Sequence, residues 1–152
     1  MTKILLITST LAALSLVVLG TTFQSQPAFA KRVQEYFKEK EPEWELSRKD
    51  EVGKALVFHW QSGKEQTSVD IETYASAEEA QIRLRQRMML VNVPPKSHTN
   101  KIGDETVLYQ SDKTQSGTLF IRKGSIFIQV DSTSITHAER FAKRVIDLVS
   151  AP

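Results

Sequence analysis

Three histidines are the residues of this sequence whose type best suits acid–base or metal chemistry. His59 lies in a segment that alternates like a β-strand, His98 lies in a loop with two prolines, and His137 follows a helix-start signal. Metal ligands must converge in space, and no spacing such as His-x-His or His-Glu-x-x-His joins these residues. We therefore expect no metal site, and we assign no catalytic residue.

Two pairs of carboxylates, Asp70 with Glu72 and Asp104 with Glu105, have the side chains that a general acid and a general base require. Asp70 and Glu72 share one face of a predicted strand, because side chains alternate between the two faces of a strand. A solvated strand face explains the first pair, and the Gly-Asp sequence before Glu105 is an ordinary turn opener. A structural interpretation is therefore favoured for both pairs.

An enzyme remains the alternative interpretation of these residues. A small periplasmic hydrolase or metal-dependent enzyme would use His98 or His59 together with Asp104 or Glu105. That alternative requires two of the four side chains to approach within hydrogen-bond distance in one cleft.

The first thirty residues have the pattern of a secretory signal peptide. Lys3 supplies a basic start, residues 4–20 form an apolar run, and the more polar tail ends in Ala28-Phe29-Ala30, an A-x-A cleavage signal. An uncleaved anchor is the alternative, but the run is shorter than the roughly 20 apolar residues of a membrane span. We expect cleavage after Ala30 and export to the periplasm or the extracellular space, with membrane contact only if the leader is retained.

The remaining segment, residues 31–152, has nearly balanced charge and no cysteine. Loss of Lys3 with the leader leaves 19 basic and 18 acidic side chains, whereas phosphate binding needs a clustered basic excess. The absence of cysteine excludes disulfides, a thiolate nucleophile and cysteine metal ligands. We expect one packed domain without a cofactor and without a nucleic-acid partner.

The hydrophobic period changes from two to 3.6 twice along this segment, which predicts an α+β domain. The predicted strands are residues 44–48, 55–60, 67–74, 105–111, 118–122 and 125–131. Helical patterns cover three segments. The first is residues 31–41. The second follows a capping box at Ser76–Glu79 and should end before Pro94-Pro95, and the third follows a second capping box at Thr136–Glu139. The two capping boxes lie sixty residues apart, which suggests tandem βββα units. We expect an antiparallel sheet of about six strands in βββα-βββα order, with the two later helices on one face and a short N-terminal helix.

The stretch LFIRKGSIFIQV, residues 119–130, is apolar at consecutive positions, so both faces of this hairpin need cover. A two-residue turn at Lys123-Gly124 would pair Phe120 with Phe127, whereas a type I turn with a bulge at Gly124 would pair Phe120 with Ile126. The second register is favoured because lysine avoids positive φ. Both registers leave large apolar side chains on the outer face.

Two interpretations of that outer face follow. The helix at 31–40 would cover it with Val33, Tyr36 and Phe37, or the face would be free to bind a partner. In the second case the candidate binding residues are Phe120 and Phe127, together with Lys96 and His98 of the long proline loop.

Four short motifs in the second half of the chain resemble those of small exported bacterial α+β domains of uncharacterised function. They are Ser-x-Glu-Glu-Ala at 76–80, Gly-Asp-Glu at 103–105, Phe-x-Arg-Lys-Gly at 120–124 and Ala-Glu-x-x-Ala at 138–142. The resemblance implies an extracytoplasmic α+β domain and carries over no catalytic residue. We therefore expect a non-catalytic binding or interaction module, whose partner is an unidentified envelope protein or an apolar small molecule.

Overall fold

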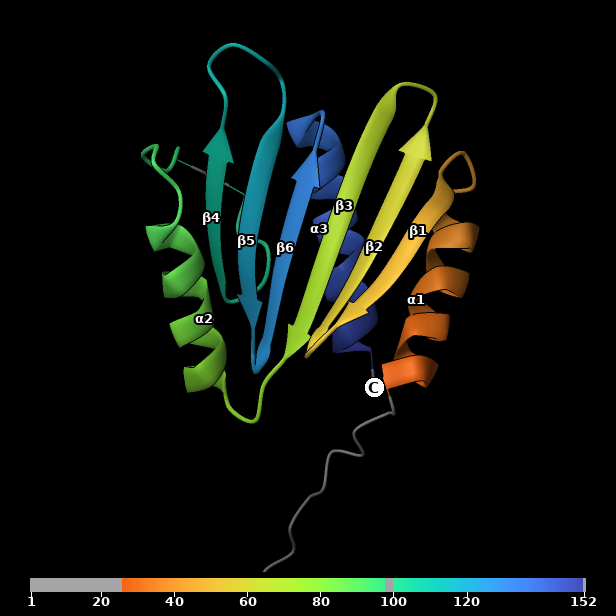
Figure 1. Ribbon diagram of the computed structural model, residues 1–152, viewed down its shortest axis with the longest axis horizontal. Helices are drawn as coiled ribbons and strands as arrows, with labels where there is room; N and C mark the ends of the chain where they lie inside the picture. Colours follow the sequence, from red (N-terminus) through yellow and green to blue (C-terminus); the bar gives the residue numbers. More distant parts are fainter. Residues whose placement is uncertain (1–25, 98–99, 152) are drawn as a thin grey trace, which may run out of the picture.

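A computed structural model describes residues 26–97 and 100–151 (Figure 1). Its elements follow one another as α1 (Gln26–Lys40), β1 (Glu45–Val52), β2 (Ala55–Ser62), β3 (Glu65–Thr73), α2 (Ala77–Met89), β4 (Glu105–Gln110), β5 (Gly117–Lys123), β6 (Ile126–Ser132) and α3 (Ile135–Ser150). The α+β class and the single antiparallel sheet of six strands are confirmed. None of the helices in the described ranges is long and apolar enough to cross a membrane.

The strands lie in the order β1-β2-β3-β6-β5-β4, and every neighbouring pair is antiparallel. β3 and β6 therefore meet at the centre of the sheet, where Val69 lies directly opposite Val130. These two residues occupy corresponding places in the predicted tandem units. The units nevertheless pack differently, because their helices lie on opposite faces of the sheet.

Three hairpins turn in the same way, on a glycine followed by one polar residue. Gly53, Gly63 and Gly124 have φ of 61°, 59° and 55°, and no other residue type in the described ranges has positive φ. A positive φ at the first central position alone is the pattern of a type II′ turn, which suits the twist of a two-residue hairpin. Glycine supplies this conformation without a steric penalty.

Both predicted registers of the β5–β6 hairpin are therefore wrong. The turn is Gly124-Ser125, so Lys123 pairs with Ile126 and Phe120 pairs with Gln129. Lysine never enters the positive-φ position, because the glycine itself is the first turn residue.

One face of the sheet, which we call the α3 face, carries the main core. Figure 1 shows α3 behind the central strands. Its buried stripe includes Phe141 and Val145, which pack on Val69, Ile128 and Leu119. The helix begins earlier than predicted, with Ser134 as its N-cap. The Ser134 side chain makes no capping hydrogen bond. The expected capping box at 136–139 is therefore wrong.

The helix α1 also packs on the α3 face, which corrects its predicted position. Phe37 is buried with its ring centroid 4.6 Å from that of Trp60 and 5.0 Å from that of Phe141. Val33 joins the same cluster, and Tyr36 packs at its edge. The apolar stripe of α1 completes the core that α3 shares with the sheet, so it does not reach the other face. The expected cleavage position after Ala30 lies inside α1, and the Ala30 side chain is buried in this core.

The helix α2 covers the opposite face, which we call the α2 face, so the prediction of α2 and α3 on one face is wrong. Leu84 of α2 packs with Tyr109, Phe120 and Phe127 in a second, smaller cluster. The Ser76 hydroxyl accepts a 3.1 Å hydrogen bond from the Glu79 amide, which confirms the predicted helix start. Strands β5 and β6 are apolar on both faces, so each face needs a helix of its own.

Candidate functional site

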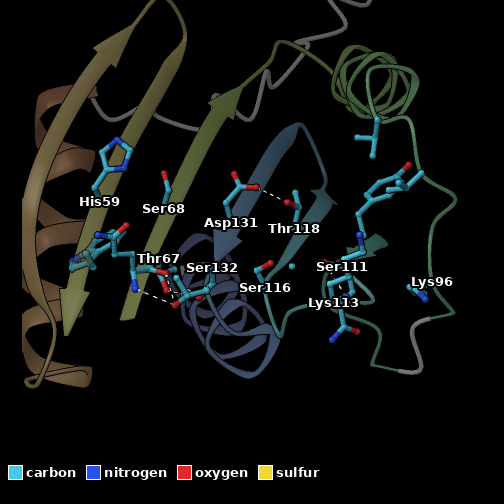
Figure 2. A pocket seen from close by; sticks show the side chains of 18 of the residues that line it. His59, Thr67, Ser68, Lys96, Ser111, Lys113, Ser116, Thr118, Asp131 and Ser132 are labelled. Carbon is cyan, nitrogen blue, oxygen red and sulfur yellow. Dashed lines mark hydrogen bonds between the residues drawn. The ribbon is translucent and has the colours of Figure 1, made fainter. Parts of the chain in front are cut away.

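A groove of about 1050 Å³ crosses the part of the α2 face that α2 leaves open. It lies between β1 and β2 on one side and the segment after α2 on the other, with the β4–β5 connection at one end (Figure 2). We call it the sheet groove. The strands under it are polar on this face and apolar on the α3 face, because their sequences alternate.

The floor of the sheet groove is a row of side chains in register, one from each strand. Cross-strand pairing aligns Arg48 with His59, His59 with Ser68, Ser68 with Asp131, Asp131 with Thr118 and Thr118 with Tyr109. Figure 2 shows His59, Ser68, Asp131 and Thr118 on the same side of the sheet. At about 4.8 Å between strands, the row is about 24 Å long. Only the pairing register brings these distant residues together.

The wall beside Tyr109 is apolar and comes from the segment after α2. Val91, Val93 and Pro94 line the groove there. The Lys96 backbone amide donates a 2.8 Å hydrogen bond to the Leu108 carbonyl, which fixes this segment against β4. The Lys96 side chain lines the groove as well and forms an ion pair with Asp112. Lys96 thus lies at the candidate site, and its role in binding stays a prediction.

Phe120 and Phe127 do not present an apolar surface, which corrects the premise on which they were chosen. Phe120 is 3% exposed and Phe127 is fully buried beneath α2. The exposed large apolar side chains lie instead at the end of α2 and after it, at Met89, Leu90 and Val93. The fourth candidate, His98, lies outside the described residues.

Asp131 is the carboxylate at the centre of the floor. The Thr118 hydroxyl donates to it at 2.5 Å, and the Gln129 side-chain amide donates to it at 2.7 Å. No cation among residues 26–97 and 100–151 lies within ion-pair distance of this carboxylate. Asp131 is therefore a negative charge that is held in place by neutral donors.

Asp70 lies next to this position on β3, directly opposite Gln129. Burial raises the pKa of Asp70 from 3.8 to about 6, and the negative charges of Glu72 and Asp131 add to the shift. Arg87 acts in the other direction from 3.6 Å. Asp70 Oδ1 is buried and has no hydrogen-bond donor in the described part of the chain.

Glu72 lies on the part of the α2 face that α2 covers, outside the sheet groove. Its carboxylate is buried and accepts hydrogen bonds of 3.0 and 2.6 Å from Arg83 of α2. The Tyr74 hydroxyl also donates to Glu72, and burial together with this bond raises the pKa of Tyr74 to about 12. Asp70 and Glu72 share a face as predicted, but α2 and its two arginines cover them, so this face is not simply solvated.

The pH dependence of the free energy of unfolding should reveal the cost of ionising the buried Asp70 carboxyl. Its pKa is higher in the folded than in the unfolded chain, so its contribution to stability is complete below about pH 4 and is lost as the pH rises through 6. The difference corresponds to about 3 kcal/mol for a shielded group, which partial solvent access reduces to about 1–2 kcal/mol. We expect Asp70→Asn to be more stable than the wild type by this amount at pH 8 and equal to it at pH 4.

Urea denaturation of both proteins between pH 4 and 8 measures this difference. Asp112→Asn, at an exposed carboxylate of the groove rim, controls for the loss of one negative charge. A constant difference between Asp70→Asn and the wild type across the range would show that Asp70 is not destabilised by its ionisation.

The acidic partners proposed for His59 in the enzyme alternative lie far from it. Asp104 and Glu105 lie at the start of β4, where Arg122 is 3.3 Å from Asp104 and 3.6 Å from Glu105. Three strands separate β2 from β4, a distance of about 19 Å. The Gly124 amide donates a 2.7 Å hydrogen bond to Asp104, which lowers the pKa of that carboxyl and identifies its structural role.

The two described histidines do not meet each other either. His59 lies 3.7 Å from Asp50 on the α2 face, whereas His137 lies 3.6 Å from Glu65 and packs against Trp44 of the main core. The described residues contain no group of three or more His, Cys, Asp or Glu side chains that could hold a metal ion.

Sequence reasoning missed the row because it depends on the register of all six strands. A local signal was nevertheless present: Ser68, Asp70 and Glu72 alternate with apolar residues in β3, as Gln129 and Asp131 do in β6. Two neighbouring strands with one polar face each indicate a part of the sheet that no helix fully covers.

Comparison of the chain with protein-family models gives no match, and a search of curated proteins gives none either. The function of the sheet groove must therefore be argued from its geometry.

Proposed function

We propose that the protein is a non-catalytic binding module of the cell envelope and that the sheet groove holds its ligand. The observation that carries this proposal is the groove of about 1050 Å³, which lies at the upper end of the usual size range of ligand sites. Its floor combines a carboxylate, a histidine and hydroxyls, and its wall is apolar. Such a surface offers both orientation and burial to a ligand. The proposed location rests on the leader sequence.

The arrangement around His59 supports binding more than catalysis. Asp50, His59 and Ser68 follow one another across three strands, which is the order of a base-assisted nucleophile. However, Asp50 lies 3.7 Å from His59 and forms a closer 2.6 Å ion pair with Arg48. No hydrogen bond joins His59 to Ser68 in the described structure. An activated serine requires both contacts at about 2.6–3.2 Å.

Blocking the floor of the groove tests the proposal. Ser68→Trp places a large ring at the centre of the row, whereas Ser150→Trp makes the same exchange at the exposed end of α3. Low-molecular-weight material from the envelope fraction is titrated into isotope-labelled protein, and amide chemical shifts are recorded. We expect shifts at Ser68 and Thr118, with affinity reduced at least about tenfold by Ser68→Trp alone, since a loss of about 1.4 kcal/mol has this effect.

Two outcomes of this titration would contradict the proposal. One is a set of shifts confined to α1 and α3, on the far side of the sheet. The other is equal binding by wild type and Ser68→Trp.

A further inference from the structure

Asp131 gives the sheet groove a preference for one kind of ligand charge. Two other charged side chains of the row and rim have partners within the chain: Arg48 lies 2.6 Å from Asp50, and Lys96 pairs with Asp112. Asp131, in contrast, receives only the neutral donors Thr118 and Gln129 among the described residues. The charge that the floor lacks is therefore positive.

Two buried acceptors next to Asp131 also lack donors. Asp70 Oδ1 and Gln129 Oε1 have no hydrogen-bond partner within the described part of the chain. The two residues face each other across β3 and β6, and the Gln129 amide nitrogen binds Asp131, so all three side chains form one cluster. Both atoms are buried and neither residue lines the groove, so they add negative charge density beside Asp131 without themselves contacting a ligand. A guanidinium or ammonium group, which carries a positive charge and several N–H donors, complements such a carboxylate.

The surroundings of the cluster indicate an extended ligand. The row is about 24 Å long, which matches six or seven residues of an extended peptide at about 3.3 Å each. At one end Val91 and Val93 offer an apolar contact, and along the floor the hydroxyls of Ser68 and Ser116 can bond to peptide groups. Lys113, exposed in the β4–β5 connection, can attract a carboxylate of the same ligand.

Other ligand classes fit this surface less well. A lipid tail needs a continuous apolar floor, and this floor is interrupted by Arg48, His59 and Asp131. A nucleic-acid backbone would be repelled by Asp131. A sugar ring commonly stacks on an exposed aromatic face, and the two aromatic residues of the lining, Trp60 and Tyr109, are buried.

We propose that the sheet groove binds an extended peptide segment by seating one of its arginine or lysine side chains on Asp131, beside Asp70 and Gln129. The proposal rests on the function proposed above and specifies its ligand class. Charge-assisted hydrogen bonds to the cation supply the specificity, and the apolar wall accepts a neighbouring side chain.

The test compares two pools of heptapeptides with random flanks on the purified, immobilised chain. One pool carries arginine at the central position and the other carries citrulline, which has nearly the same shape but no charge. We expect the arginine pool to bind at least tenfold more tightly than the citrulline pool. Asp131→Asn should abolish this preference, whereas Asp147→Asn, an equal change of charge at an exposed position of α3 on the other side of the sheet, should preserve it. Displacement of the bound arginine pool should need at least a tenfold higher concentration of spermidine than of free peptides from the same pool.

Equal retention of the two pools, or an unchanged preference in Asp131→Asn, would overturn the proposal. Displacement by spermidine at the concentrations at which the peptides compete would show that a small amine is the ligand, and would overturn the peptide assignment. If no pool binds while the envelope fraction still shifts Ser68 and Thr118, this inference fails and the binding function of the groove stands. Full binding of the envelope material by Ser68→Trp would instead remove the function itself.

Discussion

Phe37→Ala is expected to lower the free energy of unfolding by about 3–5 kcal/mol, the usual cost of removing a buried phenylalanine ring. The ring is fully enclosed between Trp60 of β2 and Phe141 of α3, at centroid distances of 4.6 and 5.0 Å. It therefore joins three elements in one aromatic cluster. Urea denaturation followed by far-ultraviolet circular dichroism measures the loss.

The matched control for this substitution is Lys38→Ala, one residue further along α1. Lys38 is exposed, so its removal should change stability by less than about 0.5 kcal/mol. A loss below 1 kcal/mol for Phe37→Ala would show that α1 is only loosely attached. Cleavage after Ala30, as predicted from the sequence, would shorten α1 but leave Phe37 in the chain.

The fold class followed from the sequence because it depends on local periodicity. The helices that follow β3 and β6 have a period of 3.6 and β2 and β3 have a period of two, whereas β5 and β6 are short apolar runs on either side of a glycine turn, and the structure contains all of them. The face that each helix covers is a different matter. Leu119 and Ile121 point to one face of β5 while Phe120 points to the other. The strand therefore needs a packing element on each face, but its sequence does not indicate which helix packs on which face. Both α1 and α2 carry suitable apolar stripes, and only packing of the whole domain decides between them.

The candidate site was predicted only in part, for a related reason. Lys96 was chosen as a residue of an irregular loop, and it does line the groove. Asp131 and Ser68 were not chosen, because their proximity depends on the pairing of β3 with β6 across more than sixty residues. The hairpin turn shows how sensitive such pairing is. Placing it at Lys123-Gly124 rather than Gly124-Ser125 moves every partner along β6.

The two clusters explain why the groove exists at all. The α3 face is covered by two helices, whereas α2 alone covers the other face, where it packs mainly on β5 and β6 and its arginines reach Asp70 and Glu72 of β3. Strands β1 to β3 carry mostly polar side chains on that face, where no helix covers them fully. The groove is therefore the part of the sheet that a single helix of thirteen residues is too short to cover. Its boundary depends on how firmly α2 is held.

Phe127→Ala should weaken that attachment and cost about 3–4 kcal/mol of global stability. Phe127 is completely buried, lies 6.0 Å from the Phe120 ring centroid and packs under Leu84 of α2, with the Arg83 guanidinium 5.9 Å from its ring centroid. The cluster contains only four buried residues, so the loss of one ring removes much of the apolar hold on α2. Amide exchange should therefore accelerate more in α2 than in α3, because local opening of α2 becomes easier than global unfolding.

Ile82→Ala provides the comparison on the same helix, since Ile82 is about half exposed and should lose little stability. Equal acceleration of exchange in α2 and α3 by Phe127→Ala would show that the two helices unfold as one unit and that the small cluster does not hold α2 separately. Selective acceleration would instead identify α2 as the element that can move independently of the main core. Because Arg87 of α2 lies 3.6 Å from Asp70, such a movement would also take a positive charge away from this buried carboxylate.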